Sequence, residues 1–99
     1  MEEDAVLYEL SYSDTYFKHI KKHKKAKQVK ILKRIAELLE DIAQEPTRGV
    51  GNPEALRHYG ESDVWSRRID AKHRLMYEIF EEEKRIEILS AYGHYKDKD

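Results

Sequence analysis

The chain has no cysteine among its 99 residues, so it forms no disulfide bond and offers no thiolate ligand to a metal. Long apolar segments are also missing, because the longest runs are about four residues and a membrane-spanning helix needs roughly 20. The N-terminus is acidic at residues 2–4, where a secretory signal peptide would be basic. These absences predict a soluble protein of the reducing cytoplasm that does not enter a membrane.

A chain of this length has room for one hydrophobic core, which buries roughly two thirds of the surface that the unfolded chain exposes. The sequence contains no internal repeat and no low-complexity linker that would divide it. We therefore expect residues 1–99 to form a single domain, with disordered ends at residues 1–4 and 96–99.

Charge is segregated along the chain, although the net charge is only −1. Residues 18–34 contain eight lysines and one arginine but no acid, and such a stretch produces a local positive field. Four of these lysines are candidates for contacts with RNA: Lys21, Lys22, Lys24 and Lys25. The alternative is an ordinary solvated helix face, because exposed lysines are common.

Hydrophobic spacing predicts two helices, after a short first strand at residues 6–10. The first helix begins at Ser11 or Ser13, either of which suits an N-cap, and ends near residue 25. The second helix is predicted by apolar residues that recur at three and four positions: Val29, Leu32, Ile35, Ala36, Leu39 and Ile42. Pro46 marks its end.

Three β-strands follow, at residues 64–70, 74–80 and 85–92, joined by connections of hairpin length. The order of elements is therefore β-α-α-β-β-β. We expect an α+β fold in which a twisted antiparallel sheet carries two helices packed on one face.

The alternation of residues along these strands predicts which side chains share a face of the sheet. One apolar set should meet the helices: Ile69, Leu75, Tyr77 and Ile79. Arg68 and Arg74 then converge on the uncovered face from adjacent strands, while Arg67 points to the covered side or its rim. The alternative for Arg74 is an ion pair with the nearby Glu78. Trp65 shares the parity of Ile69, so we expect it in the core.

Four segments, in order and with fitting gaps, carry a family resemblance: Asn52-Pro53-Glu54-Ala55-Leu56, Trp65-Ser66-Arg67-Arg68-Ile69, His73-Arg74-Leu75-Met76-Tyr77 and Gly93-His94-Tyr95. The chain resembles the Txe/YoeB family of addiction-module toxins, within the RelE/ParE superfamily, from the first predicted helix to Tyr95. The resemblance implies a RelE-like microbial RNase fold and an endonuclease that cleaves mRNA in the ribosomal A site. It also implies a cognate antitoxin, a homodimer and no cofactor.

The resemblance assigns the catalytic residues to Glu54, Arg68, Arg74, His94 and Tyr95. Metal-independent cleavage of RNA uses the ribose 2′-hydroxyl as nucleophile, so it needs a base, an acid and cations around the phosphate. Glu54 is the candidate base and His94 the candidate acid. Arg68 and Arg74 supply planar pairs of donors to phosphate oxygens. Tyr95 stacks on a base or hydrogen-bonds the phosphate.

We further expect Arg57 and Arg67 to bind the substrate. Arg57 stands where the family commonly has lysine. Two other departures are Ala55, which replaces the family's usual second proline, and a tail at residues 96–99 beyond the usual terminal tyrosine.

The remaining histidines are expected at the surface or in turns: His19, His23, His58 and His73. His19 and His23 have the spacing of a helical metal pair, but no third ligand is evident and lysines surround them, so we expect no metal site. Two other functions stay open. One is a non-catalytic toxin like the ParE branch, which binds and blocks DNA gyrase, and the other is a plain RNA-binding module.

Overall fold

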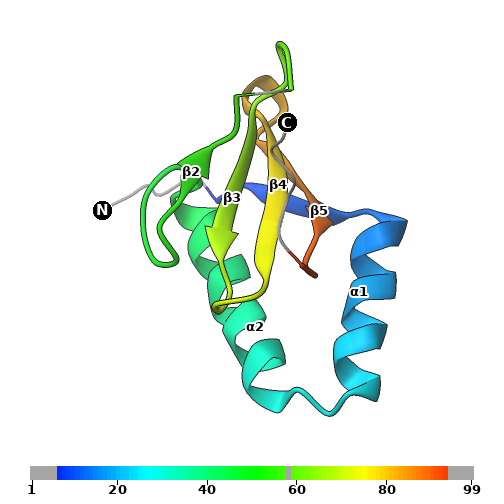
Figure 1. Cartoon of the computed structure of the whole chain (residues 1–99). Helices are drawn as coiled ribbons and strands as arrows, with labels where there is room; N and C mark the ends of the chain where they lie inside the picture. Colours follow the sequence, from blue (N-terminus) through cyan, green and yellow to red (C-terminus); the bar gives the residue numbers. More distant parts are fainter. Residues whose placement is uncertain (1–6, 58, 94–99) are drawn as a thin grey trace.

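The computed structural model describes residues 7–57 and 59–93, which form two helices packed on a five-stranded sheet (Figure 1). The helices are α1 (Asp14–Lys25) and α2 (Val29–Gln44). The strands are β1 (Glu9–Tyr12), β2 (Glu54–Ala55), β3 (Val64–Arg68), β4 (Arg74–Phe80) and β5 (Arg85–Ser90), with a 3₁₀ turn, η1 (Glu81–Glu83), between the last two. The predicted disordered ends, residues 1–4 and 96–99, lie outside the described residues. Within the described ranges, neither helix is long and apolar enough to cross a membrane.

The predicted α+β class and the order of the main elements are confirmed, but the sheet differs in two respects. Its strand order is β1-β5-β4-β3-β2, and β1 pairs with β5 in parallel, so the sheet is mixed rather than wholly antiparallel. The two helices between β1 and the rest of the sheet form the long crossover that a parallel strand requires. The second difference is β2, an added edge strand of two residues.

The N-terminus of α1 is fixed by Ser13, one of the two predicted caps. Its hydroxyl oxygen accepts a hydrogen bond from the amide of Tyr16 at 3.0 Å and donates one to the carbonyl of Leu89 at 2.7 Å. Leu89 lies at a register shift, because Met76 pairs with Ser90 while Tyr77 pairs with Ile88. The cap thus connects the start of α1 to β5 at the irregular point of the ladder.

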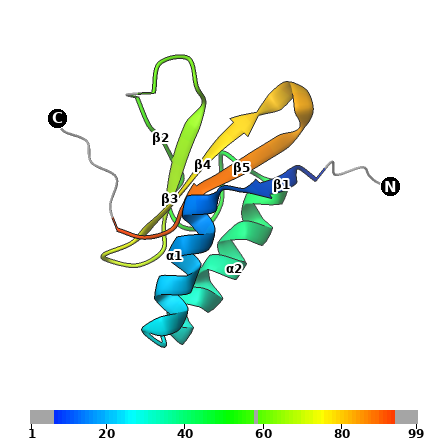
Figure 2. The ribbon, with the colours of Figure 1, turned by 90° about the vertical axis from the view of Figure 1, so that its right-hand side faces the viewer.

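The core lies between the sheet and the helices, which cover the same side of it (Figure 2). The buried stripe of α2 consists of Ile31, Ile35, Leu38 and Ile42. It packs with the predicted inward residues of β4, and Leu75 and Tyr77 are completely buried. Ile69 is also buried, and Trp65 is half-buried against the core. The period-two prediction is therefore confirmed for these residues, and the opposite face of β3 and β4 carries Arg68 and Arg74 as well as the apolar Val64 and Met76.

Candidate active site at the junction of β3 and β4

Arg68 and Arg74 face each other across two strands, at the last position of β3 and the first of β4. The register shift lies between β4 and β5, so the predicted pairing of β3 with β4 is undisturbed. Arg68 is exposed, whereas only 14% of the Arg74 side chain is accessible to solvent. The two arginines are therefore direct neighbours in the strand pairing at one end of the sheet, where the Arg74 side chain is largely buried and Arg68 is exposed.

Glu54 joins Arg74 from the edge strand. It lies opposite Ser66 in the pairing of β2 with β3, and its Oε1 is 3.6 Å from Nη1 of Arg74. The same Nη1 donates a hydrogen bond to the Ser66 hydroxyl at 3.3 Å. Glu54 was expected in a loop, but the structure places it in β2. Two residues are too short a strand to be recognised from hydrophobic alternation.

The structure pairs Arg74 with Glu54, whereas the sequence had offered Glu78 as a possible partner. Half of the Glu54 side chain is exposed, and an ion pair at this distance and exposure contributes only about 0–1 kcal/mol. The carboxylate is thus held near Arg74 without being locked to it. A carboxylate beside one arginine, with a second arginine on the paired strand, can accept a proton while the arginines bind an anionic oxygen.

The segment that follows β5 is attached to the same corner. The backbone amide of Arg74 donates to the carbonyl of Gly93 at 3.0 Å. Gly93 has φ of +76°, a left-handed conformation that favours glycine. His94 and Tyr95, the predicted acid and stacking residue, lie outside the described residues. The structure therefore assembles Glu54, Arg68 and Arg74.

Arg67 does not have the position expected of a substrate-binding residue. Its side chain is fully buried on the helix side of the sheet, as its parity allowed, and its five N–H groups all have acceptors. Nη1 binds the carboxylate of Asp41 at 2.5 Å, and Nε binds the Tyr77 hydroxyl at 3.1 Å. The predicted contact with RNA is corrected to a structural role, because a guanidinium with no free donor and no exposure cannot bind RNA.

The remaining donors of Arg67 fix the loop that precedes β2. They bind the carbonyls of Glu45 at 2.5 Å, Arg48 at 2.8 Å and Val50 at 3.0 Å. Gly49 is required in this loop, since it has φ of +126° and any Cβ would collide with the Asp41 carboxylate. The base candidate thus follows a loop that is anchored on a buried charge.

The remaining predicted contact residues are exposed. Arg57 follows β2, and the four lysines lie on α1. The Nζ atom of Lys22 is 4.1 Å from the centre of the Tyr92 ring, so the basic helix reaches the segment that ends at Gly93. The structure thereby brings part of the lysine stretch close to the junction of β3 and β4, although they are far apart in sequence.

The expected surface position of His23 is wrong, because the structure buries this side chain to 1% exposure between α1 and the end of β5. The polar spacing of α1, which is rich in lysine, gave no sign of a buried face at this point. His19 and His73 are half-buried, and His58 lies outside the described residues. Within residues 7–57 and 59–93, no group of three or more histidine and acidic side chains is arranged to hold a metal ion.

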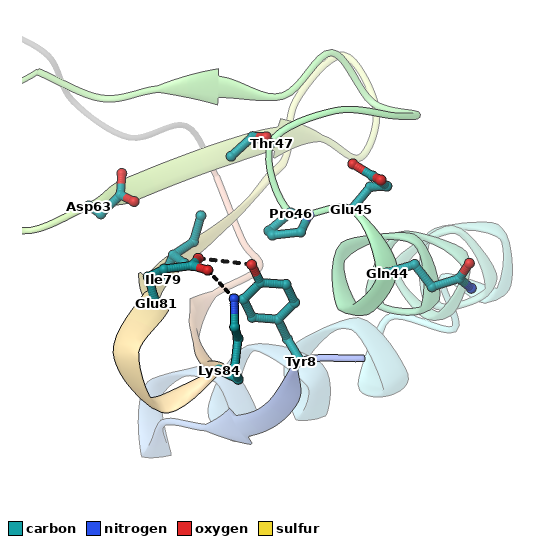
Figure 3. Close-up of a pocket in the computed structure, with 9 residues that line it drawn as sticks. All are labelled: Tyr8, Gln44, Glu45, Pro46, Thr47, Asp63, Ile79, Glu81 and Lys84. Atoms are coloured by element: carbon teal, nitrogen blue, oxygen red, sulfur yellow. Dashed lines mark hydrogen bonds and ion pairs between the residues drawn. The ribbon is translucent and has the colours of Figure 1, made fainter. Parts of the chain in front are cut away.

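A pocket of about 420 Å³ lies elsewhere, between β1, the end of α2 and the turn before β5 (Figure 3). The Tyr8 hydroxyl donates to Glu81 at 2.8 Å, and Lys84 pairs with the same carboxylate (Figure 3). Among the residues that the structure describes, no predicted site residue lines this pocket. The candidate active site is therefore an open corner of the sheet, separate from this pocket.

Comparison with known proteins shows the family to which the chain belongs. The model of the YoeB-like toxins of bacterial type II toxin–antitoxin systems matches residues 11–95. The chain belongs to this family. The toxin YoeB of Streptomyces coelicolor is 46% identical over 67 residues, which cover 67% of this chain and 75% of that protein. The suspected family is confirmed.

Solved structures give the same result for the fold. The YoeB dimer from Staphylococcus aureus superposes with a TM-score of 0.75 at 31% identity, covering 89% of this chain and 98% of the other. The YoeB–YefM complex from the same organism has a TM-score of 0.71 at 32% identity, with the same coverage. The fold is that of the YoeB toxins.

Proposed function

We propose that this YoeB-family toxin is a ribosome-dependent endoribonuclease that cleaves mRNA in the A site and so inhibits translation in the cytoplasm. The observation that carries the proposal is the placement of the Glu54 carboxylate 3.6 Å from Arg74, with Arg68 directly across the strand pair. A carboxylate beside two phosphate-binding groups is the arrangement needed to activate a ribose hydroxyl next to a phosphodiester.

In the proposed reaction, Glu54 takes the proton of the ribose 2′-hydroxyl, whose oxygen then attacks the adjacent phosphorus. Arg68 and Arg74 stabilise the negative charge that develops on the phosphoryl oxygens. His94 protonates the 5′-oxygen as its bond to phosphorus breaks, which leaves a 2′,3′-cyclic phosphate and a 5′-hydroxyl. Tyr95 stacks on a neighbouring base or hydrogen-bonds the phosphate. No metal or cofactor takes part in these steps.

The ribosome is proposed to be the platform for this reaction. The exposed lysines of α1 supply point charges for ribosomal RNA, and Arg57 lies beyond the end of β2, which carries Glu54. Because Lys22 contacts Tyr92, RNA bound along α1 would approach the catalytic corner.

A cognate antitoxin and a second copy of the chain are the proposed protein partners. The relatives from Staphylococcus aureus were solved both as a dimer and as a complex of YoeB with YefM. We propose that the antitoxin binds through a segment that becomes ordered on contact and blocks or distorts the region of His94 and Tyr95.

The site favours a nuclease over both competing functions. A toxin that only binds gyrase, or a module that only binds RNA, gains nothing from a carboxylate held beside its phosphate-binding arginines. Catalysis gives this carboxylate a purpose, since a general base typically contributes about 10²–10⁴ in rate.

The test is cleavage of a message on programmed ribosomes, compared with the same message without ribosomes. Glu54→Gln should reduce ribosome-dependent cleavage about 10²–10⁴-fold and leave the thermal midpoint nearly unchanged, because the side chain is half exposed. Glu61→Gln is the control, since it removes an exposed carboxylate from the neighbouring loop. Cleavage by Glu54→Gln at the wild-type rate would overturn the assignment, and arrest of growth without any cleavage would favour gyrase as the target.

A further inference from the structure

Three histidines bind the backbone of residues 91–93, which continue from β5 toward the end of the chain. The amide of Ala91 donates to Nδ1 of His19 at 3.0 Å, and Nε2 of His23 donates to the carbonyl of the same residue at 2.8 Å. The amide of Gly93 donates to Nδ1 of His73 at 2.8 Å. His19 and His23 lie one turn apart on α1, whereas His73 immediately precedes β4.

The hydrogen bonds from these histidines take the place of strand pairing, which ends with β5 at Ser90. β5 stops at Ser90, yet Ala91 is fully buried, so its amide and carbonyl need partners from within the protein. The imidazoles supply these partners. Gly93 is held at both ends of its backbone, since His73 accepts from its amide and the amide of Arg74 donates to its carbonyl.

The rings also pack around Tyr92, which lies between the two bound residues. Its ring centre is 4.6 Å from that of His73 and 5.0 Å from that of His23. His23 and His73 are themselves in edge contact at 4.9 Å. Each side chain of the group is thus oriented by the others, which restricts the direction of the backbone at residues 91–93.

We propose that His19, His23 and His73 form a clamp that positions the end of the chain for catalysis. The proposal rests on the proposed function, in which His94 is the general acid. Gly93, the residue before His94, is hydrogen-bonded to His73 and to the backbone amide of Arg74. The clamp thus holds the residue that precedes the proposed acid next to the arginine that pairs with Glu54. The three histidines are positioning residues, because they act through the backbone and not on the substrate.

The clamp requires His19 and His73 to be uncharged, because a protonated Nδ1 cannot accept a hydrogen bond. Partial burial lowers the pKa of His19, and the charge of the neighbouring Lys22 lowers it further, which favours the uncharged state of His19. The group also borders Asp70 in the β3–β4 turn, whose carboxylate accepts a hydrogen bond from the amide of His73 at 2.8 Å.

Asp70 stays ionised throughout the pH range in which His19 changes its charge. Although partial burial acts to raise its pKa, hydrogen bonds from the amides of Lys72 and His73 hold the pKa of Asp70 below the ordinary value. Acidification toward pH 5 should therefore weaken the contact that His19 makes with the Ala91 amide, while Asp70 remains ionised.

The test compares His73→Ala with His73→Asn. Both variants lose the ring contacts, but the asparagine side-chain oxygen lies close to the place of Nδ1 and can accept from Gly93 without titrating. His73→Ala should lower kcat for ribosome-dependent cleavage about 10- to 100-fold with KM little changed, as expected for a misplaced catalytic group. His73→Asn should recover most of this loss.

A second readout does not depend on catalysis. In the purified chain, hydrogen exchange of the Gly93 amide should accelerate in His73→Ala and slow again in His73→Asn, at similar thermal midpoints. If the wild type does not cleave RNA but the amide responds in this way, the proposed function fails and the clamp stands. If the Gly93 amide is indifferent to both substitutions, or if Ala and Asn variants have equal kcat, the clamp is overturned.

Discussion

The two segments that lead to the proposed base and acid are held by different chemistry. The loop before Glu54 is fixed by Arg67, a fully buried guanidinium that is charged at every relevant pH. Residues 91–93, which follow β5, are held in part by His19 and His73, whose neutral imidazoles accept hydrogen bonds from backbone amides. The first attachment is therefore part of the folded core, whereas the second responds to pH.

The largest effect should follow loss of the arginine. Arg67→Met should destabilise the protein by about 3–5 kcal/mol, because it leaves the Asp41 carboxylate and three loop carbonyls without their donor. Urea unfolding at pH 6 and pH 8 should give the same loss at both values. A loss that depended strongly on pH within this range would break the contrast between the two attachments.

A smaller effect is expected at Gly49, where the backbone lies against the ion pair of Arg67 and Asp41. Gly49→Ala combines a left-handed φ with a collision against Asp41, and should cost about 1–3 kcal/mol. Gly60→Ala is the control, because it also has a positive φ but a Cβ there would meet no atom within 4 Å. Equal losses for the two variants in thermal unfolding would show that the contact with Asp41 is unimportant.

Lowering the pH should weaken the other attachment, in which His19 accepts a hydrogen bond from the amide of Ala91. The pKa of His19 in the folded protein lies below its ordinary value near 6.5, mainly because of burial, so the unfolded chain binds the proton more readily. The contribution of His19 to the free energy of unfolding should be fully present above pH 6.5. It should be lost as the pH falls through the range between the pKa of His19 in the unfolded chain and its lower pKa in the folded protein. His19→Asn should flatten this part of the profile measured by urea unfolding between pH 7.5 and 5. An unchanged profile would remove His19 from the account.

The smallest effect on stability is expected from the lysines of α1. Lys21→Glu, Lys24→Glu and Lys25→Glu together should leave the fold intact but weaken binding to ribosomes and flatten its salt dependence, with roughly 0.7–0.9 in the slope lost per phosphate contact. Lys22 is kept, because it contacts Tyr92 beside the clamp. Binding that is unchanged at both low and high salt would return these lysines to the role of a solvated helix face.

Much of the fold was predictable because it depends on regular patterns. The stripe of α2 and the alternation along β4 fixed the buried faces, and alternation also paired Arg68 with Arg74. The parallel pairing of β1 and the strand β2 were missed, since neither follows from local periodicity.

The candidate site could be predicted only in part from the sequence. The family resemblance selected Glu54, but its contact with Arg74 depends on an edge strand of two residues. Arg67 and His23 were misjudged because charged and polar side chains are seldom fully buried, and their partners are backbone carbonyls that no sequence pattern reveals.

The most direct measurement of the central claim is the chemistry of the ends produced when the purified toxin cuts a message on programmed ribosomes. Attack by the 2′-hydroxyl predicts a 5′-hydroxyl on the downstream fragment and a 2′,3′-cyclic or 3′-phosphate on the upstream one. It also predicts that Glu54→Gln yields the same ends at a rate lower by about 10²–10⁴-fold. A 5′-phosphate with a 3′-hydroxyl, or an intact message from translating ribosomes that the toxin has arrested, would contradict the account.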